Sequence, residues 1–241
     1  EINLALGQQY MRYLLSGDNV AGNMIMMILH WAQLVGSKKA KPFLRAHYKT
    51  LQQWASFLID DSLVPASQLS TDDFAGVLAN QSNLAVKGIA GISSMGYISD
   101  MLGKTADAKN YHNISLSYAQ LFAGYAISKN GSHIKLAYQD DSSWGTLYNL
   151  FFDRLLNLRV FPKKIYSILD AWYPQVVEKY GVPLDSRHKW GKSDWMMFEA
   201  ANSVSNSTRK LFINRLHRFV SDGFTDSPVS DLYETTSKLS S

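Results

Sequence analysis

The chain has 241 residues, 46% of them hydrophobic and 18% charged, and a formal charge of +4. This length suits one large domain or two small ones, and the composition excludes a disordered tail, a collagen-like chain and a membrane-embedded protein. The sequence contains no cysteine, which excludes a disulfide framework, a cysteine-ligated zinc site and a cysteine nucleophile. We expect a single domain over residues 1–241.

The basic residues do not form the dense stripe that nucleic-acid-binding proteins carry. They lie in short, dispersed clusters, such as Lys163 with Lys164, which solvated helix faces explain. The most apolar segment, 24–35, is interrupted by His30 and Gln33 and is too short to span a bilayer. The first ten residues do not have the pattern of a signal peptide, so a secreted form would be a mature chain or a fragment of a precursor. We therefore expect neither a nucleic-acid partner nor a membrane.

Apolar residues recur at intervals of three and four along most of the chain, which predicts amphipathic helices. The first helix is expected to bury a stripe of five side chains: Met24, Met27, Ile28, Trp31 and Leu34. The second is expected to open at Pro42 and to bury another stripe: Phe43, His47, Leu51, Trp54 and Leu58. Eight helices are predicted in all, over residues 21–36, 42–60, 83–102, 106–128, 146–158, 163–180, 193–204 and 206–220.

These helices follow one another in pairs, and longer loops separate the pairs at 61–81, 131–145 and 182–192. Residues 133–138 alternate weakly, which favours a short strand, and Asn206 is the predicted N-cap of the last helix. The predicted fold class is all-α: four antiparallel helical hairpins that form part of an α/α toroid, or a helical solenoid.

Common catalytic signatures fail on inspection. The six histidines show no metal-ligand spacing, Met95 stands where a nucleophile elbow needs glycine, and Ser186 stands where a phosphate-binding loop needs glycine. We expect neither a metal nor a cofactor.

The loop at 61–81 contains adjacent carboxylates, Asp72 and Asp73. Such a pair can supply a general base with its electrostatic neighbour, or hold the ammonium group of a substrate. Equally, Ser70 or Thr71 can cap a short helix whose positive end the two carboxylates favour.

The loop at 182–192, with the residues that follow it, gathers five ionisable side chains between two tryptophans. They are Asp185, Arg187, His188, Lys192 and Asp194, flanked by Trp190 and Trp195. Such a loop offers a guanidinium for a carboxylate, an imidazole for proton transfer and aromatic walls that exclude water. The alternative is an ion-paired loop in which Ser193 caps the next helix.

Four Asn-x-Ser/Thr sequons permit glycosylation in a secretory pathway: Asn80, Asn113, Asn130 and Asn206. They favour a secreted, extracellular glycoprotein.

Several segments in order along nearly the whole chain resemble the fungal-type glutaminase A family: Gly22–Gln33, Leu69–Gly76, Leu78–Gly88, Trp144–Leu156, Gly181–His188 and Lys192–Trp195. The resemblance implies a six-helical-hairpin domain, secretion, and hydrolysis of glutamine to glutamate and ammonia. The resemblance also implies that family members are much longer. Since four hairpins are predicted here against six in the family, we expect this chain to correspond to the C-terminal two-thirds of that toroid. Family members carry a glutamate before the first of these motifs where this sequence has only Asp18, which leaves a non-hydrolytic relative as an alternative.

Roles follow from chemical type. Asp72 or Asp73 would be the general base, and its neighbour would hold the substrate ammonium. Arg187 would pair with the α-carboxylate, and His188 or Lys192 would assist the departure of ammonia. Asp194 is a further catalytic candidate, and the remaining substrate-binding candidates are Asn83, Trp144, Trp190 and Trp195.

Two other functions remain open. A carbohydrate-binding or non-catalytic protein would use Trp144, Trp190 and Trp195 to stack on sugar rings, an argument from fold analogy. A glycoside hydrolase would need Asp72 or Asp73 to lie about 5–10 Å from Asp194 across a cleft. The expected partners are a small amide or a glycan, and either a second chain from the same precursor or another copy of this chain.

Overall fold

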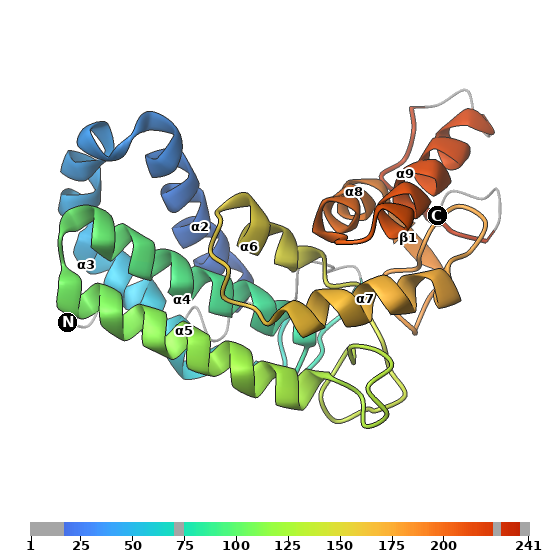
Figure 1. Ribbon diagram of the computed structural model, residues 1–241, viewed down its shortest axis with the longest axis horizontal. Helices are drawn as coiled ribbons and strands as arrows, with labels where there is room; N and C mark the ends of the chain where they lie inside the picture. The colour runs from blue at the N-terminus through green and yellow to red at the C-terminus, as the bar shows by residue number, and fades with distance from the viewer. Residues whose placement is uncertain (1–16, 70–74, 224–227, 237–241) are drawn as a thin grey trace. The chain divides into compact units, whose positions relative to one another are not determined.

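The computed structural model describes residues 17–69, 75–223 and 228–236, and helices dominate it (Figure 1). The α-helices are α2 (Gly17–Val35), α3 (Ser37–Asp61), α4 (Ser82–Leu102), α5 (Thr105–Ala126), α6 (Phe151–Leu155), α7 (Lys163–Val176), α8 (Ser193–Asn202) and α9 (Asn206–Ser221). A 3-10 turn, η2 (Tyr148–Leu150), precedes α6, and the strands β1 (Trp190–Lys192) and β2 (Leu232–Glu234) form one small antiparallel pair. The all-α prediction is confirmed.

The chain divides into two compact units. The first comprises Glu1–Gly124 with Phe152–Phe161, and the second comprises Tyr125–Phe151 with Pro162–Ser241. Each is described by itself below, and the expectation of one domain over the whole chain stays a prediction.

The first unit is built around α4, which is buried on nearly all of its faces. Helices α2 and α3 pack on it and on each other. Glycines make the close approach possible: a methyl group on Gly91 would lie 3.1 Å from Gly22 Cα of α2, and one on Gly96 would lie 2.7 Å from the His112 ring of α5. The glycines of α4 therefore allow α2 and α5 to pack closely against it.

The predicted buried stripe of α2 is wrong. Met24, Met27, Trp31 and Leu34 are exposed, Leu34 to 74%. The face that packs on α4 carries smaller residues, with Ala21, Ile25, Met26, Leu29 and Ala32 all at 1% exposure or less. Because α2 is apolar on both faces, its periodicity does not show which face is buried. The face with the smaller side chains packs on α4, whose surface is lined with glycine.

The second predicted helix begins five residues too late. Gly36 has a φ of 84°, a left-handed conformation that turns the chain sharply, and α3 starts directly after it at Ser37, with Pro42 inside the helix. Leu51 and Leu58 are buried as expected, but Phe43 and His47 lie at the surface, where their rings are 4.4 Å apart. His47 is therefore not a core residue.

The second unit holds α7, α8 and α9, with α8 packed on α9. Ser205, not Asn206, is the N-cap of α9: its hydroxyl accepts hydrogen bonds from the backbone N–H groups of Ser207 and Thr208. Asp170 of α7 accepts from the N–H groups of Val204 and Ser205, at 2.9 and 2.6 Å. This carboxylate therefore fixes the turn between α8 and α9 to α7.

Three other predicted elements differ from the structure. The helix predicted at 146–158 is broken into η2 and the five-residue α6. The helix predicted at 163–180 ends at Val176, because Pro174 lies in its last turn and Val177 is extended. The strand predicted at 133–138 is only an isolated bridge between Ile127 and Ile134. The strands β1 and β2 were not predicted at all.

We expect Gly88→Ala to lower the free energy of unfolding by about 1–3 kcal/mol, the usual cost of overpacking. The added methyl group would overlap the buried side chain of Ser62. Gly124→Ala in α5 is the matched control, because nothing lies within 4 Å of its added carbon and alanine favours the helix. Denaturant unfolding of both variants checks this, and equal stability of the two would contradict it.

Candidate functional site

The loop at 182–192 is held in the second unit by backbone hydrogen bonds. Leu184 N–H donates to Trp190 O at 2.8 Å, and Thr146 N–H donates to Leu184 O at 2.7 Å. Gly145 and Asp185 form an isolated antiparallel bridge. The loop thus closes on itself and on the segment that precedes η2, which gives its side chains fixed positions.

Asp185 and Arg187 bind each other within this loop. Asp185, 4% exposed, accepts from the backbone N–H of Arg187 at 2.8 Å and from its Nε and Nη2 at 3.1 and 2.6 Å. The guanidinium predicted to bind a substrate carboxylate therefore already holds a carboxylate of the protein.

Lys192 and Asp194 are also paired, with a partner far along the chain. Lys192 Nζ lies 3.2 Å from Asp194 Oδ2 and 2.6 Å from Asp231 Oδ2. Burial lowers the pKa of Lys192, but its hydrogen bonds to Asp231 and Asp194 outweigh this effect and the pKa is raised. Lys192 is thus a permanent cation that ties the start of α8 to the segment before β2. The N-cap residue of α8 is Lys192 itself, and no side chain caps the helix.

The three predicted tryptophans have different surroundings. Trp195 is 6% exposed, stacks on Tyr148 with ring centroids 4.1 Å apart, and carries Lys192 Nζ 4.8 Å from its ring. It is a core residue, so the expectation of an exposed ring that stacks on a sugar is wrong for Trp195. Trp190 is half-buried under the exposed His188 ring at 3.9 Å, and Trp144 is half-buried beside Trp172 at 6.1 Å.

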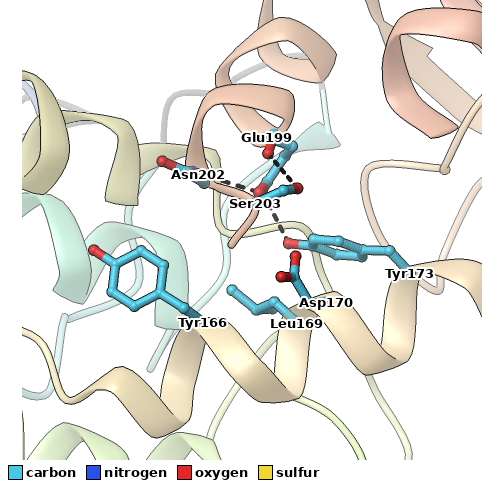
Figure 2. A pocket seen from close by; sticks show the side chains of 7 residues that line it. All are labelled: Tyr166, Leu169, Asp170, Tyr173, Glu199, Asn202 and Ser203. Carbon is cyan, nitrogen blue, oxygen red and sulfur yellow. Dashed lines mark hydrogen bonds between the residues drawn. The ribbon is translucent and has the colours of Figure 1, made fainter. Parts of the chain in front are cut away.

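A buried carboxyl group lies in a small pocket between α7 and α8 (Figure 2). Glu199 is 1% exposed, and its Oε1 accepts a hydrogen bond from the Tyr173 hydroxyl at 2.9 Å. Burial raises the pKa of Glu199 to about 8, although hydrogen bonds from Tyr173 and Asn202 oppose the rise. Glu199 therefore titrates close to neutral pH.

The other residues that line this pocket are Tyr166, Leu169, Asp170, Asn202 and Ser203. The Tyr173 hydroxyl accepts a hydrogen bond from Leu147 N–H at 3.1 Å, and burial, followed by the nearby Glu199, raises the pKa of Tyr173 well above its ordinary value. The phenol thus stays protonated and donates to Glu199. None of these pocket residues was predicted, although a glutamate and an asparagine on the buried face of α8 are a detectable exception to its apolar pattern.

A second buried titratable group lies in the first unit, on α4. Lys87 is 2% exposed, burial lowers its pKa to about 7, and its Nζ lies 5.8 Å from the Phe152 ring centroid. Asn83, a predicted substrate-binding residue, is 5% exposed and one turn before Lys87. The start of α4 is therefore a polar, buried segment, because Gln81 and Ser82 are also at most 1% exposed.

Asp72 and Asp73 lie outside the described residues, so their distances to Arg187 and Asp194 are not part of the description. Their predicted roles stay predictions, as do the roles of His188 and Asp194. Among the described residues, no group of three His, Asp or Glu side chains is arranged to hold a metal ion. In the same part of the chain, no helix is both long and apolar enough to cross a membrane.

The four predicted glycosylation sites differ in exposure. Asn130 lies in an exposed turn, Asn113 is exposed on α5 and Asn206 is exposed at the start of α9. Asn80 is half-buried, and the serine of its sequon, Ser82, is fully buried.

Comparison with known proteins decides the family. Residues 7–241 match the model of the glutaminase A six helical-hairpin domain. The chain belongs to the glutaminase A family. It is 43% identical over 216 residues to Glutaminase A of Aspergillus oryzae, with 89% of this chain and 31% of that protein covered.

A second relative in this family is a protein of Arthroderma benhamiae with the name "Probable glutaminase". The identity is 40%, with 81% of this chain and 26% of that protein covered. The chain thus spans less than a third of the length of either glutaminase relative. The six-hairpin family agrees with the all-α fold and with the resemblance found in the sequence.

We expect Glu199→Gln to remove a pH dependence of stability. The pKa of Glu199 is raised from 4.5 to about 8, so between these values the folded chain keeps a proton that the unfolded chain loses. Stability then falls as the pH rises, by about 1.4 kcal/mol per pH unit. Glutamine does not ionise, so its stability has no such pH dependence. The stability of the variant relative to the wild type should therefore rise from pH 5 to pH 8, as measured by thermal unfolding. A constant difference across this range would contradict the prediction.

Proposed function

We propose that this chain carries glutaminase-type amide hydrolysis, the conversion of glutamine to glutamate and ammonia, in a secreted protein. The observation that carries the proposal is the family match over residues 7–241, together with two relatives that are named as glutaminases. Because the chain covers less than a third of each relative, its activity in isolation is itself part of the proposal.

The reaction needs a base and an acid. A water molecule attacks the carboxamide carbon, a base accepts the proton of that water, and the nitrogen leaves as ammonia after it gains a proton. Asp72 or Asp73 remains the proposed base. For the acid, the geometry favours His188 over Lys192, because His188 is exposed whereas Lys192 is held as a cation by Asp194 and Asp231.

In this proposal, Arg187 can offer a substrate fewer N–H donors than an unpaired guanidinium would. Three hydrogen bonds bind it to the buried Asp185, and its side chain is 27% exposed. A substrate carboxylate would have to share the guanidinium with Asp185. We therefore propose that Arg187 binds the α-carboxylate from the loop surface, with Asp185 fixing its orientation.

Ammonia release from glutamine tests the proposal, with the purified chain alone and together with any polypeptide that copurifies. We expect Asp72→Asn or Asp73→Asn to lower kcat about 10²–10⁴-fold, the usual contribution of a general base. Asp60→Asn is the matched control, because Asp60 is an exposed carboxylate near the end of α3, and it should leave kcat unchanged. No ammonia from any wild-type preparation would reject the proposed reaction.

Secretion has its own test. We expect a chain expressed in a secreting eukaryotic host to carry N-glycans and to lose mass on treatment with an endoglycosidase. Asn130→Gln should remove one glycan, because Asn130 lies in an exposed turn, whereas Asn80→Gln should change nothing, because Ser82 of its sequon is buried. Intact-mass measurement checks both, and a secreted chain without any glycan would contradict the expectation.

A further inference from the structure

We propose that the exposed face of α2 is a docking surface for an amphipathic helix of another polypeptide, one whose apolar side chains pack on α2 and whose carboxylates meet the lysines at the start of α3. This surface belongs to the first unit alone. It is independent of the proposed reaction, because none of its residues takes part in the amide hydrolysis.

A row of large apolar side chains lies exposed along α2. The row, here named the α2 stripe, consists of five residues that are exposed to between 37% and 74%: Val20, Met24, Met27, Trp31 and Leu34. Single exposed apolar residues are normal on a protein surface, whereas a contiguous apolar patch marks an interaction site. The α2 stripe therefore calls for an occupant.

The spacing of the α2 stripe identifies that occupant as a helix. Its residues follow one another at intervals of four, three, four and three, which is the repeat of a coiled-coil seam. At about 100° per residue, the five side chains fall within an arc of about 80°. A helix on a lipid surface carries a charged face opposite its apolar one, whereas the opposite face of α2 is apolar and packs on α4.

The α2 stripe continues onto α3 and is bordered there by positive charge. The Trp31 ring lies 5.1 Å from the Phe43 ring of α3, centroid to centroid, and Phe43 is 41% exposed. Lys39 lies four residues before Phe43 on the same side of the helix. Lys39 and its neighbour Lys38 are both exposed, so a partner seated on the stripe would meet their ammonium groups.

The charges around the stripe favour an acidic partner. Residues 19–59 contain no aspartate or glutamate and five lysines and arginines: Lys38, Lys39, Lys41, Arg45 and Lys49. None of these five forms an ion pair with the residues that the structure describes. Carboxylates beside the apolar stripe of a partner would be attracted, and basic groups there would be repelled. A second copy of this chain fits less well, because its own α2 and α3 carry the same excess of positive charge.

Binding of two synthetic helical peptides to the full chain tests the proposal. Each peptide has three heptads with leucine at the two apolar positions, and the flanking positions carry glutamate in one peptide and lysine in the other. The like charges disfavour pairing of each peptide with itself. In fluorescence anisotropy at low salt, we expect the chain to bind the acidic peptide about tenfold more tightly than the basic one. High salt should reduce this difference, because it screens exposed charges.

Met27→Glu places a charge in the middle of the α2 stripe. It should weaken binding of the acidic peptide at least about tenfold, because a charge buried against apolar side chains is unfavourable. Leu116→Glu is the matched control, since Leu116 is 49% exposed on α5 of the same unit, and it should leave the affinity unchanged. If Met27→Glu fails to fold, as judged by its thermal unfolding, Leu34→Glu replaces it with the same expected loss, because Leu34 is 74% exposed.

Lys39→Glu tests the charge of the partner. It replaces an attraction by a repulsion, so the preference for the acidic peptide should fall from about tenfold to less than about threefold. Lys109→Glu makes the same charge change at an exposed position of α5, and it should keep the full preference. An unchanged preference in Lys39→Glu overturns the charge match.

Equal affinity of the wild type for the two peptides, or no binding of the acidic one, overturns the acidic helix as the partner. Unchanged binding by the folded Met27 variant overturns the assignment of the surface. A wild-type chain that sediments as a dimer, and that Met27→Glu makes monomeric, assigns the surface to a second copy and overturns the proposed partner. Binding to phosphatidylserine vesicles without binding of the acidic peptide assigns it to lipid and overturns the partner as well.

Discussion

Burial of the Glu199 carboxyl is the constraint on which the second unit depends. A carboxyl group removed from water must find hydrogen bonds inside the protein, and Tyr173 of α7 and Asn202 of α8 supply them. Both partners are in turn bound to the backbone of Leu147, so one buried acid joins two helices and the segment before η2. Hydrogen bonds of this kind are strengthened by the low dielectric of the protein interior.

The helices were predictable because their signal is local. Periodicity gave the position and order of α4, α5 and α9 to within two residues. The identity of the buried face, however, depends on the neighbouring helix. Helix α2 is apolar on two sides, and the side with Gly22 and Ala21 is buried because the facing surface of α4 is itself lined with glycine. Similarly, α3 begins at Ser37 because Gly36 has a positive φ and turns the chain there. The sequence instead favoured a start at Pro42, five residues later.

The candidate site was only partly predictable, for a related reason. The cluster from Asp185 to Asp194 stands out in the sequence, but its chemistry depends on pairings that composition does not show. Asp185 binds Arg187 two residues away, whereas Lys192 binds Asp231 thirty-nine residues further on. The latter contact exists only because β2 returns to β1. Glu199 was not singled out because it interrupts the apolar face of α8 without matching the spacing of any catalytic or metal-binding motif.

The strand β2 closes the second unit from the far end of the sequence. Tyr233 is fully buried, stacks on Phe219 at 3.7 Å and donates its hydroxyl to the carbonyl of Tyr180 at 3.1 Å. Its ring thus fills the core of the second unit, and it is synthesised after α7, α8 and α9. This half of the core is therefore complete only after synthesis has passed β2, and a chain cut before Leu232 would leave Phe219 and Tyr180 without the ring that covers them.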